Sequence, residues 1–418
     1  MGNLLGAPVT EKETHVGTTP EGIPYGVSSM QGWRVHMEDA HITQEELYAI
    51  ESNVGSGAEV NEIPLDGHSL FAVFDGHGGT FAAMYSGRNF CRVLSRQPKF
   101  VDYANFSKEW AESRETMPAS GKAQYVQNGL GMLEAALRDA FVEIDKEIAL
   151  ALQGSHVPDA DTPYHSKISI GDTDTENGKH TGSCGDATTA ETTTMNSEKS
   201  VEGEGDSGTT ACVVVVTPEW IICANAGDSR SVFSRSGTKV VPLSYDHKPD
   251  DDEEQQRIRA AGGYVAGGRV EGDLAVSRGL GDYRFKRLDV VLAANSEVPS
   301  LEMKPGDQKV SPIPDIMVQD RDTLQDEFII IACDGIWDVQ TNYEAVKTVS
   351  QLFQEGESNV GLICEEMLDC CLDMGSKDNM TALVIKFDGQ TIGQGGGVLA
   401  RRQLREAEEE EHGSNASK

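Results

Sequence analysis

Short apolar runs, most of them followed at once by Gly, Asp or Asn, recur along this chain. Five runs are rich in Val, Ile and Phe and have the length of β-strands: Ser69–Phe74, Ala211–Thr217, Trp220–Ala224, Phe328–Cys333 and Thr381–Phe387. Apolar residues at helical spacing predict helices near 130–153 and over Val360–Cys371. A third helix is expected at Glu253–Ala261, before two glycines. Strands with helices between and outside them indicate a sheet-rich α+β fold.

Polar stretches divide the chain around and within one predicted domain, 25–388. Residues 98–128 are polar but contain five aromatic side chains, so we expect an inserted helical excursion. Residues 155–207 consist mainly of Ser, Thr, Gly, Asp and Glu, and cannot bury enough apolar surface to order themselves. They are expected to be a disordered insertion. Residues 1–24 are interpreted as an N-terminal extension and 389–418 as a disordered tail.

The negative net charge of the chain disfavours some classes of binding partner. The chain has 418 residues, 38% of them hydrophobic, and a formal net charge of −33. Such a surface repels nucleic acid and anionic lipid headgroups, so neither is an expected partner. Excess carboxylates suit a protein that binds cations, but simple solubility is the favoured explanation of the charge taken alone.

The cysteine positions and the absence of targeting signals predict the cellular compartment of the protein. The eight cysteines form no C-x-x-C pair and most lie in apolar runs, as expected of buried thiols in a reducing compartment. No apolar run is long enough to span a membrane, and no signal peptide begins the chain. We therefore expect a monomer in the cytoplasm or nucleus. Gly2 is available for N-myristoylation, but Gly6 stands where Ser or Thr is usual.

Acidic residues flank the predicted strands. Asp75, Asp228 and Asp334 follow apolar runs, Asp378 precedes one, and the pair Glu38-Asp39 forms a fifth acidic cluster. An aspartate beside a buried strand is costly unless its charge is compensated. Any one of these clusters can be a turn, because Asp-Gly is a common turn signal. Five such clusters in one chain make turns alone a poor explanation.

The residue types favour a hard divalent cation. Carboxylates and backbone carbonyls, with little histidine and no cysteine, prefer Mg²⁺ or Mn²⁺ to Zn²⁺. Gly76 lets the backbone approach an ion, so its carbonyl is a candidate ligand. His77 can supply a proton to a leaving group, and the fork of Arg34 can hold phosphate oxygens. The sequence contains neither a P-loop nor the Cys-x5-Arg loop of cysteine phosphatases.

Taken in order, these motifs resemble those of the protein phosphatase 2C family of metal-dependent serine/threonine phosphatases. The resemblance covers roughly residues 25–387. Its matching motifs are Gln31–Arg34 with Met37–His41, Phe74–Gly79, Ser207–Ala211, Asn225–Arg230, Leu243-Ser244 with Asp246–Pro249, Leu274–Asp282, Cys333–Asp338 and Asp378–Thr381. No single motif is specific, but their number and order are.

The resemblance implies two packed antiparallel β-sheets flanked on both faces by α-helices, a four-layer αββα sandwich. It also implies two Mg²⁺ or Mn²⁺ ions in a cleft at one end. Asp75 would bridge both ions, while Asp334 and Asp378 would hold one of them. The Gly76 carbonyl, and Glu38 through water, would hold the other.

Further roles are implied by the same resemblance. Asp39 would support bound water, and Asp228 would contribute to a weaker third metal site, with Asp338 as a less certain helper. Arg34 would bind the phosphate of a phosphorylated protein substrate, and His77 would protonate the departing Ser or Thr oxygen. A hydroxide bridging the metals would attack phosphorus directly, without a phosphoenzyme intermediate.

Some features depart from the family pattern or leave other functions open. Gly279 stands where alanine is usual and Lys377 where arginine is usual, and the segment 250–273 matches the family's flap. A catalytically dead relative acting as a scaffold would have lost ligands that are present here. A hydrolase of small phosphate esters is disfavoured by the resemblance alone. An acidic cation-buffering protein would not need Arg34 or His77.

Overall fold

The fold is described by a computed structural model. It describes residues 4–52, 60–113, 119–155, 157, 206–294 and 303–416. Gly2, and all of the predicted insertion 155–207 except four residues near its ends, lie outside the described residues.

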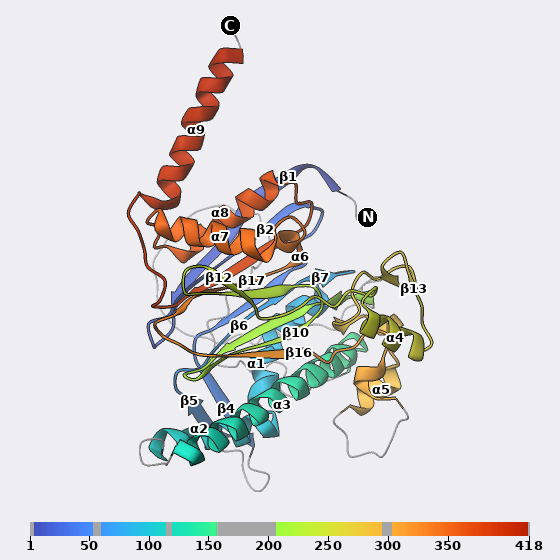
Figure 1. Ribbon diagram of the computed structural model, residues 1–418. Coiled ribbons are helices and arrows are strands. Elements are labelled where there is room, and N and C mark those ends of the chain that lie inside the picture. Colours follow the sequence, from blue (N-terminus) through green and yellow to red (C-terminus); the bar gives the residue numbers. More distant parts are fainter. Residues whose placement is uncertain are drawn as a thin grey trace, which may run out of the picture.

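Two antiparallel sheets form the centre of the molecule (Figure 1). The six-stranded sheet has the spatial order β1 (Leu4–Thr18), β2 (Pro24–Arg34), β18 (Met380–Lys386), β17 (Asp326–Ala332), β11 (Arg230–Arg235) and β12 (Lys239–Pro242). The five-stranded sheet has the order β16 (Asp315–Asp320), β10 (Trp220–Ala226), β9 (Ala211–Val216), β6 (Ser69–Phe74) and β3 (Ala40–Gln44). The five predicted strands are confirmed, each within two residues of its expected bounds.

The central strands are apolar on both faces because each face meets a different core. In β6, Phe71 and Val73 point into the core between the two sheets. Their neighbours Leu70, Ala72 and Phe74 point the other way, into the core under the helices. All five side chains are fully buried. This double burial explains why the strands appear in the sequence as continuous apolar runs rather than as an alternating pattern.

Helices cover both outer faces of the sheet pair, which gives the expected four layers (Figure 1). The five-stranded sheet is covered by α1 (Phe81–Ser95), α2 (Pro98–Ser113) and α3 (Ala119–Leu152). The six-stranded sheet is covered by α6 (Asp334–Trp337), α7 (Asn342–Gln354) and α8 (Val360–Asp373). The polar stretch 98–128 is therefore helical over its described residues.

Smaller elements surround the sandwich. A hairpin is formed by β4 (Leu47–Ser52) and β5 (Val60–Leu65). At one end lie α4 (Asp252–Ala260), β13 (Val265–Ala266), β14 (Arg269–Val270), two 3₁₀ turns (Tyr283–Phe285 and Pro305–Asp307) and α5 (Leu288–Ala293). A short three-stranded sheet joins β7 (Gly76–His77), β8 (Gly208–Thr209) and β15 (Leu280–Gly281).

The N-terminal segment corrects the expectation of an extension outside the domain. Residues 4–18 form the edge strand β1, paired with β2 up to Thr18 and Pro24. The Thr14 hydroxyl lies 3.0 Å from the Ser28 hydroxyl and also donates to Glu365 on α8 at 3.0 Å. An edge strand keeps much of its surface in water, so it needs no long apolar run, and composition alone did not reveal it.

The C-terminal segment corrects the expectation of a disordered tail. Residues 397–416 form the helix α9, which projects away from α7 and α8 (Figure 1). Its first turn is anchored because Val398 is fully buried. Arg402 and Arg405 form ion pairs with Glu366, a buried carboxylate on α8. Arg402 and Arg405 precede the acidic run Glu408–Glu411, and their partner Glu366 lies far away in the sequence.

The sandwich core makes a stability prediction. Phe71→Ala removes a large, fully buried side chain between the sheets, so it should lower the free energy of unfolding by about 3–5 kcal/mol. Leu324→Ala, at a site 88% exposed, should change it by less than about 0.5 kcal/mol. Urea denaturation measured under the same metal conditions tests both. Equal effects of the two substitutions would contradict the placement of Phe71 in the core.

Candidate metal centre

Strand direction brings the predicted acids to one end of the sandwich. Strands β6 and β10 both pair antiparallel with β9, so they run in the same direction and their following residues, Asp75 and Asp228, share one end. Strands β17 and β18 are antiparallel neighbours, so the residues after one and before the other, Asp334 and Asp378, also share an end. Acids from both sheets therefore face a common site.

Three of these carboxylates form a tight cluster. Oxygen atoms of Asp75, Asp228 and Asp334 lie within 4.8 Å of one another. The backbone N–H of Asp334 donates to Asp75 Oδ2 at 3.4 Å, which links the two sheets directly. A second group of potential ligand atoms contains Asp39, Asp75 and the Cys333 thiol. Asp75 belongs to both groups, which is consistent with the central position expected for it.

The carboxylates of the cluster disfavour one another's ionisation. Burial, together with the charge of Asp334 and other nearby acids, raises the pKa of Asp75 well above its usual value. Burial and the charges of Asp228 and Asp378 do the same to the pKa of Asp334. Burial raises the pKa of Asp39 to about 7, and its Oδ1 atom has no hydrogen-bond partner in the described part of the chain. Convergent oxygen donors that resist ionisation together fit a hard divalent cation.

The thiol beside the cluster has a structural role. Cys333 Sγ accepts a hydrogen bond from the Thr381 N–H at 3.1 Å and donates to the Asn379 carbonyl at 3.5 Å. Burial and the neighbouring charges of Asp39 and Asp75 raise the pKa of the thiol well above its usual range. It is therefore held as a neutral thiol, which is a poor nucleophile.

Glu38 and Gly76 lie close together beside the cluster. Glu38 Oε1 accepts a hydrogen bond from the Gly79 N–H at 3.1 Å. A side chain at Gly76 would place its Cβ 2.2 Å from the Glu38 carbonyl oxygen, so a glycine is required there. This close approach holds the residue that follows Asp75 against the backbone of Glu38. Both predicted ligands are thus near the centre.

Arg34 and Asp378 meet at the edge of the site. Arg34 ends β2 and forms an ion pair with Asp378 Oδ2 through one guanidinium nitrogen. The Arg34 side chain is 39% exposed and the Asp378 side chain 30%, so both reach the surface. Asp378 does not belong to either group of mutually close ligand atoms within the described ranges. It faces Arg34 instead.

Asp228 has a cationic partner that the sequence analysis did not identify. The Lys248 ammonium forms an ion pair with Asp228, whose side chain is almost fully buried. Asp338 lies one turn beyond Asp334 and donates its N–H to the Asp334 carbonyl at 2.8 Å. Burial raises the pKa of Asp338, although the nearby Lys248 opposes this rise. Lys248 lies within the motif Asp246–Pro249, but nothing in that motif indicates Asp228 as its partner.

His77 also has a partner that sequence reasoning missed. Its Nε2 donates to both carboxylate oxygens of Asp282, at 2.8 and 2.9 Å. Burial lowers the pKa of His77, but the charge and hydrogen bond of Asp282 outweigh it and the net shift is upward. His77 lies on β7 and Asp282 follows β15, so the short three-stranded sheet brings them together.

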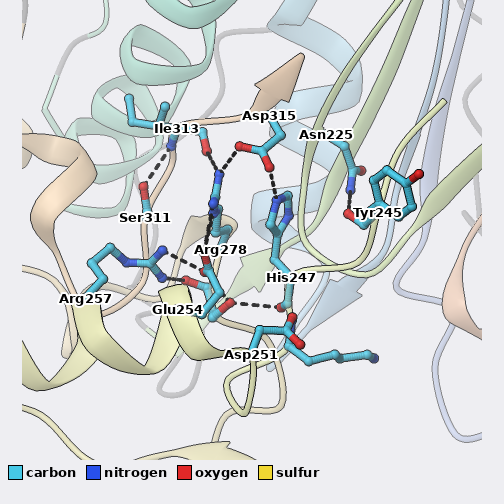
Figure 2. A network of polar contacts seen from close by, with 12 residues as sticks. Asn225, Tyr245, His247, Asp251, Glu254, Arg257, Arg278, Ser311, Ile313 and Asp315 are labelled. Atoms are coloured by element: carbon cyan, nitrogen blue, oxygen red, sulfur yellow. Dashed lines mark hydrogen bonds and ion pairs between the residues drawn. The ribbon is translucent and has the colours of Figure 1, made fainter. Parts of the chain in front are cut away.

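A buried charge network holds the predicted flap, residues 250–273, against the domain (Figure 2). Glu254 on α4 accepts from Arg257 at 2.6 Å and from Arg278 at 2.7 Å. Burial raises the pKa of Glu254, but these two arginines and the Ser277 hydroxyl lower it to about 2. Arg278 also pairs with Asp315 at the start of β16. The network ties α4 to the segment that leads to Asp282.

None of the helices in the described ranges is long and apolar enough to cross a membrane.

Comparisons with known proteins point to one family. The chain matches the family described as Protein phosphatase 2C over residues 23–175 and 156–380. It is 33% identical over 391 residues to Protein phosphatase 2C homolog 2 of Aspergillus flavus, which covers 92% of this chain and 68% of that protein. It is 33% identical over 393 residues to Protein phosphatase 2C homolog 3 of Schizosaccharomyces pombe, covering 92% and 69% respectively.

A solved structure shares the fold. The serine-threonine phosphatase 2C from Toxoplasma gondii aligns with a TM-score of 0.57 at 20% sequence identity, over 90% of this chain and 99% of that chain. The predicted four-layer α+β sandwich is therefore confirmed. With a family match over most of its length and relatives at 33% identity, the chain belongs to the protein phosphatase 2C family of serine/threonine phosphatases.

Proposed function

We propose that this protein is an Mg²⁺- or Mn²⁺-dependent protein serine/threonine phosphatase that transfers the phosphoryl group of its substrate directly to water. The observation that carries the proposal is the cluster of Asp75, Asp228 and Asp334, whose oxygens lie within 4.8 Å of one another. Phosphorylated proteins are its proposed substrates, and a monomer is its proposed form. Because the nearby Cys333 is a neutral, hydrogen-bonded thiol, no cysteine nucleophile is proposed.

The ligand set is proposed from the residues gathered at the site. Asp75 would bridge two ions, with Asp334 and Asp378 on one and the Gly76 carbonyl and water-linked Glu38 on the other. When bound, such ions neutralise the carboxylates and the substrate phosphate and activate water for attack.

The remaining acids would support this set. Asp39 is buried next to Asp75 and accepts a hydrogen bond from the Thr381 hydroxyl at 2.7 Å, so it would orient water beside the ions. Asp228 would belong to a weaker third site, where Lys248 already provides a positive charge. Asp338, one turn after Asp334, would assist there.

Arg34 and His77 would act on the substrate itself. Arg34 bonds Asp378 through one nitrogen, and the rest of its fork is then available for phosphate oxygens. The His77 side chain is 30% exposed, so part of the ring is open to solvent while Nε2 is held by Asp282. His77 would donate a proton to the departing Ser or Thr oxygen.

Removal of the central carboxylate tests the proposal. Asp75→Asn should reduce dephosphorylation of a phosphothreonine peptide by more than about 100-fold. Removing a residue that only supports a metal ligand costs up to about 100-fold, and Asp75 is proposed as a ligand itself. Mn²⁺ affinity, measured by calorimetry, should fall in parallel, and a chelator should abolish wild-type activity. Asp289→Asn removes an exposed carboxylate and serves as the control. Activity that survives chelation would refute the metal dependence.

The raised pKa values predict how metal binding depends on pH. Without metal, Asp39 of the folded protein stays protonated up to about pH 7. In the unfolded chain the pKa of Asp39 returns to its usual value of 3.8. The metal-free fold should therefore lose stability as pH rises through about 7. Bound cations must displace these protons, so the gain in melting temperature from Mg²⁺ should be larger at pH 8 than at pH 6. Equal gains at both pH values would contradict the buried, proton-sharing cluster.

Arg34 provides a test of phosphate recognition. Arg34→Ala should lower kcat/KM for a phosphopeptide by about 10–100-fold, because hydrogen bonds to a charged group are lost. Arg34→Lys keeps the charge but not the planar fork, so it should recover part of the loss. Inhibition by inorganic phosphate should weaken in the same order. If phosphate inhibits all three proteins equally, Arg34 does not bind the phosphoryl group.

A further inference from the structure

Asp282 lies in the motif Leu274–Asp282 but has no role in the ligand set. Its side chain is only 3% exposed. Both of its carboxylate oxygens accept from His77 Nε2, at 2.8 and 2.9 Å. A buried carboxylate that uses both oxygens on one ring nitrogen fixes the direction of that ring.

The backbone at Asp282 has an unusual conformation. Asp282 has φ 56° and ψ 42°, in the left-handed region, directly after Gly281 with φ 80°. Residues other than glycine rarely adopt this conformation, although Asp and Asn tolerate it best. Strain of this kind persists where the surrounding structure holds it, and it is frequent at functional sites.

A glycine opens the path between the two side chains. In the short three-stranded sheet, Gly208 lies opposite His77 on one side and Gly281 on the other. A Cβ at Gly208 would lie 2.2 Å from Asp282 Oδ2. The absence of a side chain there is what lets the Asp282 carboxylate reach across β8 to the imidazole.

The loop that carries Asp282 is anchored to α3 by a buried ion pair. Lys286 Nζ lies 2.8 Å from Asp145 Oδ1, and both side chains are buried. The Gly281 N–H donates to the same Asp145 oxygen at 2.8 Å, and Lys286 also donates to the Gly279 carbonyl at 2.9 Å. The residues on both sides of Asp282 are thus held in place from outside the metal centre.

From this arrangement we propose that Asp282 is the positioning residue for His77. By holding Nε2–H, it orients the ring so that Nδ1 faces the substrate; this rests on the proposed function of His77. As the phosphorus–oxygen bond breaks, the Nδ1 proton passes to the Ser or Thr oxygen, and the attacking water later returns a proton to the ring. The Nε2 proton remains in its hydrogen bond to Asp282 throughout.

Leaving-group dependence separates this role from a structural one. A serine alkoxide needs a proton to depart, whereas p-nitrophenolate, a much weaker base, does not. Asp282→Ala should lower kcat on a phosphoserine peptide by about 100-fold, close to the effect of His77→Gln, with KM nearly unchanged. Asp282→Asn tolerates the left-handed backbone and keeps one acceptor, so its loss should be about tenfold.

The matched measurements complete the test. Turnover of p-nitrophenyl phosphate should change less than about threefold in all of these variants, since the step needing a proton is bypassed. The double variant His77→Gln with Asp282→Ala should be no slower on the peptide than His77→Gln alone. Asp289→Asn, an exposed carboxylate in the same part of the chain, should resemble the wild type on both substrates.

Three results would overturn the inference or the function beneath it. Equal losses on both substrates in Asp282→Ala, with unchanged circular dichroism, would show that Asp282 supports the whole site rather than His77. Wild-type peptide turnover in Asp282→Ala would show that His77 needs no such partner. If His77→Gln itself fails to distinguish the substrates, the proton-donor role of His77 is wrong, and that result is independent of any Asp282 variant.

Discussion

Mutual repulsion among buried carboxylates is the constraint around which this site is built. Asp75, Asp228 and Asp334 place oxygens within 4.8 Å of one another. At an effective dielectric constant of about 20, two such charges repel by roughly 3 kcal/mol. The protein can keep these residues together when protons or cations compensate them. The raised pKa values of Asp75 and Asp334 are one expression of this constraint, and the proposed binding of divalent cations would be the other.

A rigid frame is needed to hold groups that repel one another. The two sheets provide it because Phe71 and Val73 of β6 and Ile329 and Ile331 of β17 pack in a common core between them. Residues from both sheets then meet at one end, where the Asp334 N–H bonds Asp75 and the Thr381 hydroxyl bonds Asp39. The close-packed hydrophobic core thus holds the polar site together. The acids could move apart only if the two sheets separated.

Three of the acids at this end of the sandwich each face a basic side chain. Asp378 faces Arg34, Asp228 faces Lys248, and Asp282 faces His77. Under the proposed function, cations would bind where the oxygens of Asp75, Asp228 and Asp334 converge. The arrangement also places the basic groups at the edge, where a phosphate would enter. Under the proposed function, charge compensation and substrate recognition would use the same residues.

The sequence by itself determined the strands, the acids beside them and the type of chemistry. Strand-forming runs and the identity of their flanking residues are local properties, so Asp75, Asp228 and Asp334 could be identified without coordinates. The sequence did not reveal the edge strand β1 or the helix α9. Both depend on partners that are distant in sequence, such as Ser28 and Glu366.

Only the tertiary structure decided which side chains meet. The packing of the two sheets brings Asp75 beside Asp334, 259 positions away, and a short sheet with Gly208 in its middle strand brings Asp282 to His77. Nothing near Asp282 in the sequence indicates a histidine partner, because the contact passes through a space left by a glycine on another strand. Such contacts depend on register and on the direction of strands, which are properties of the assembled sheets.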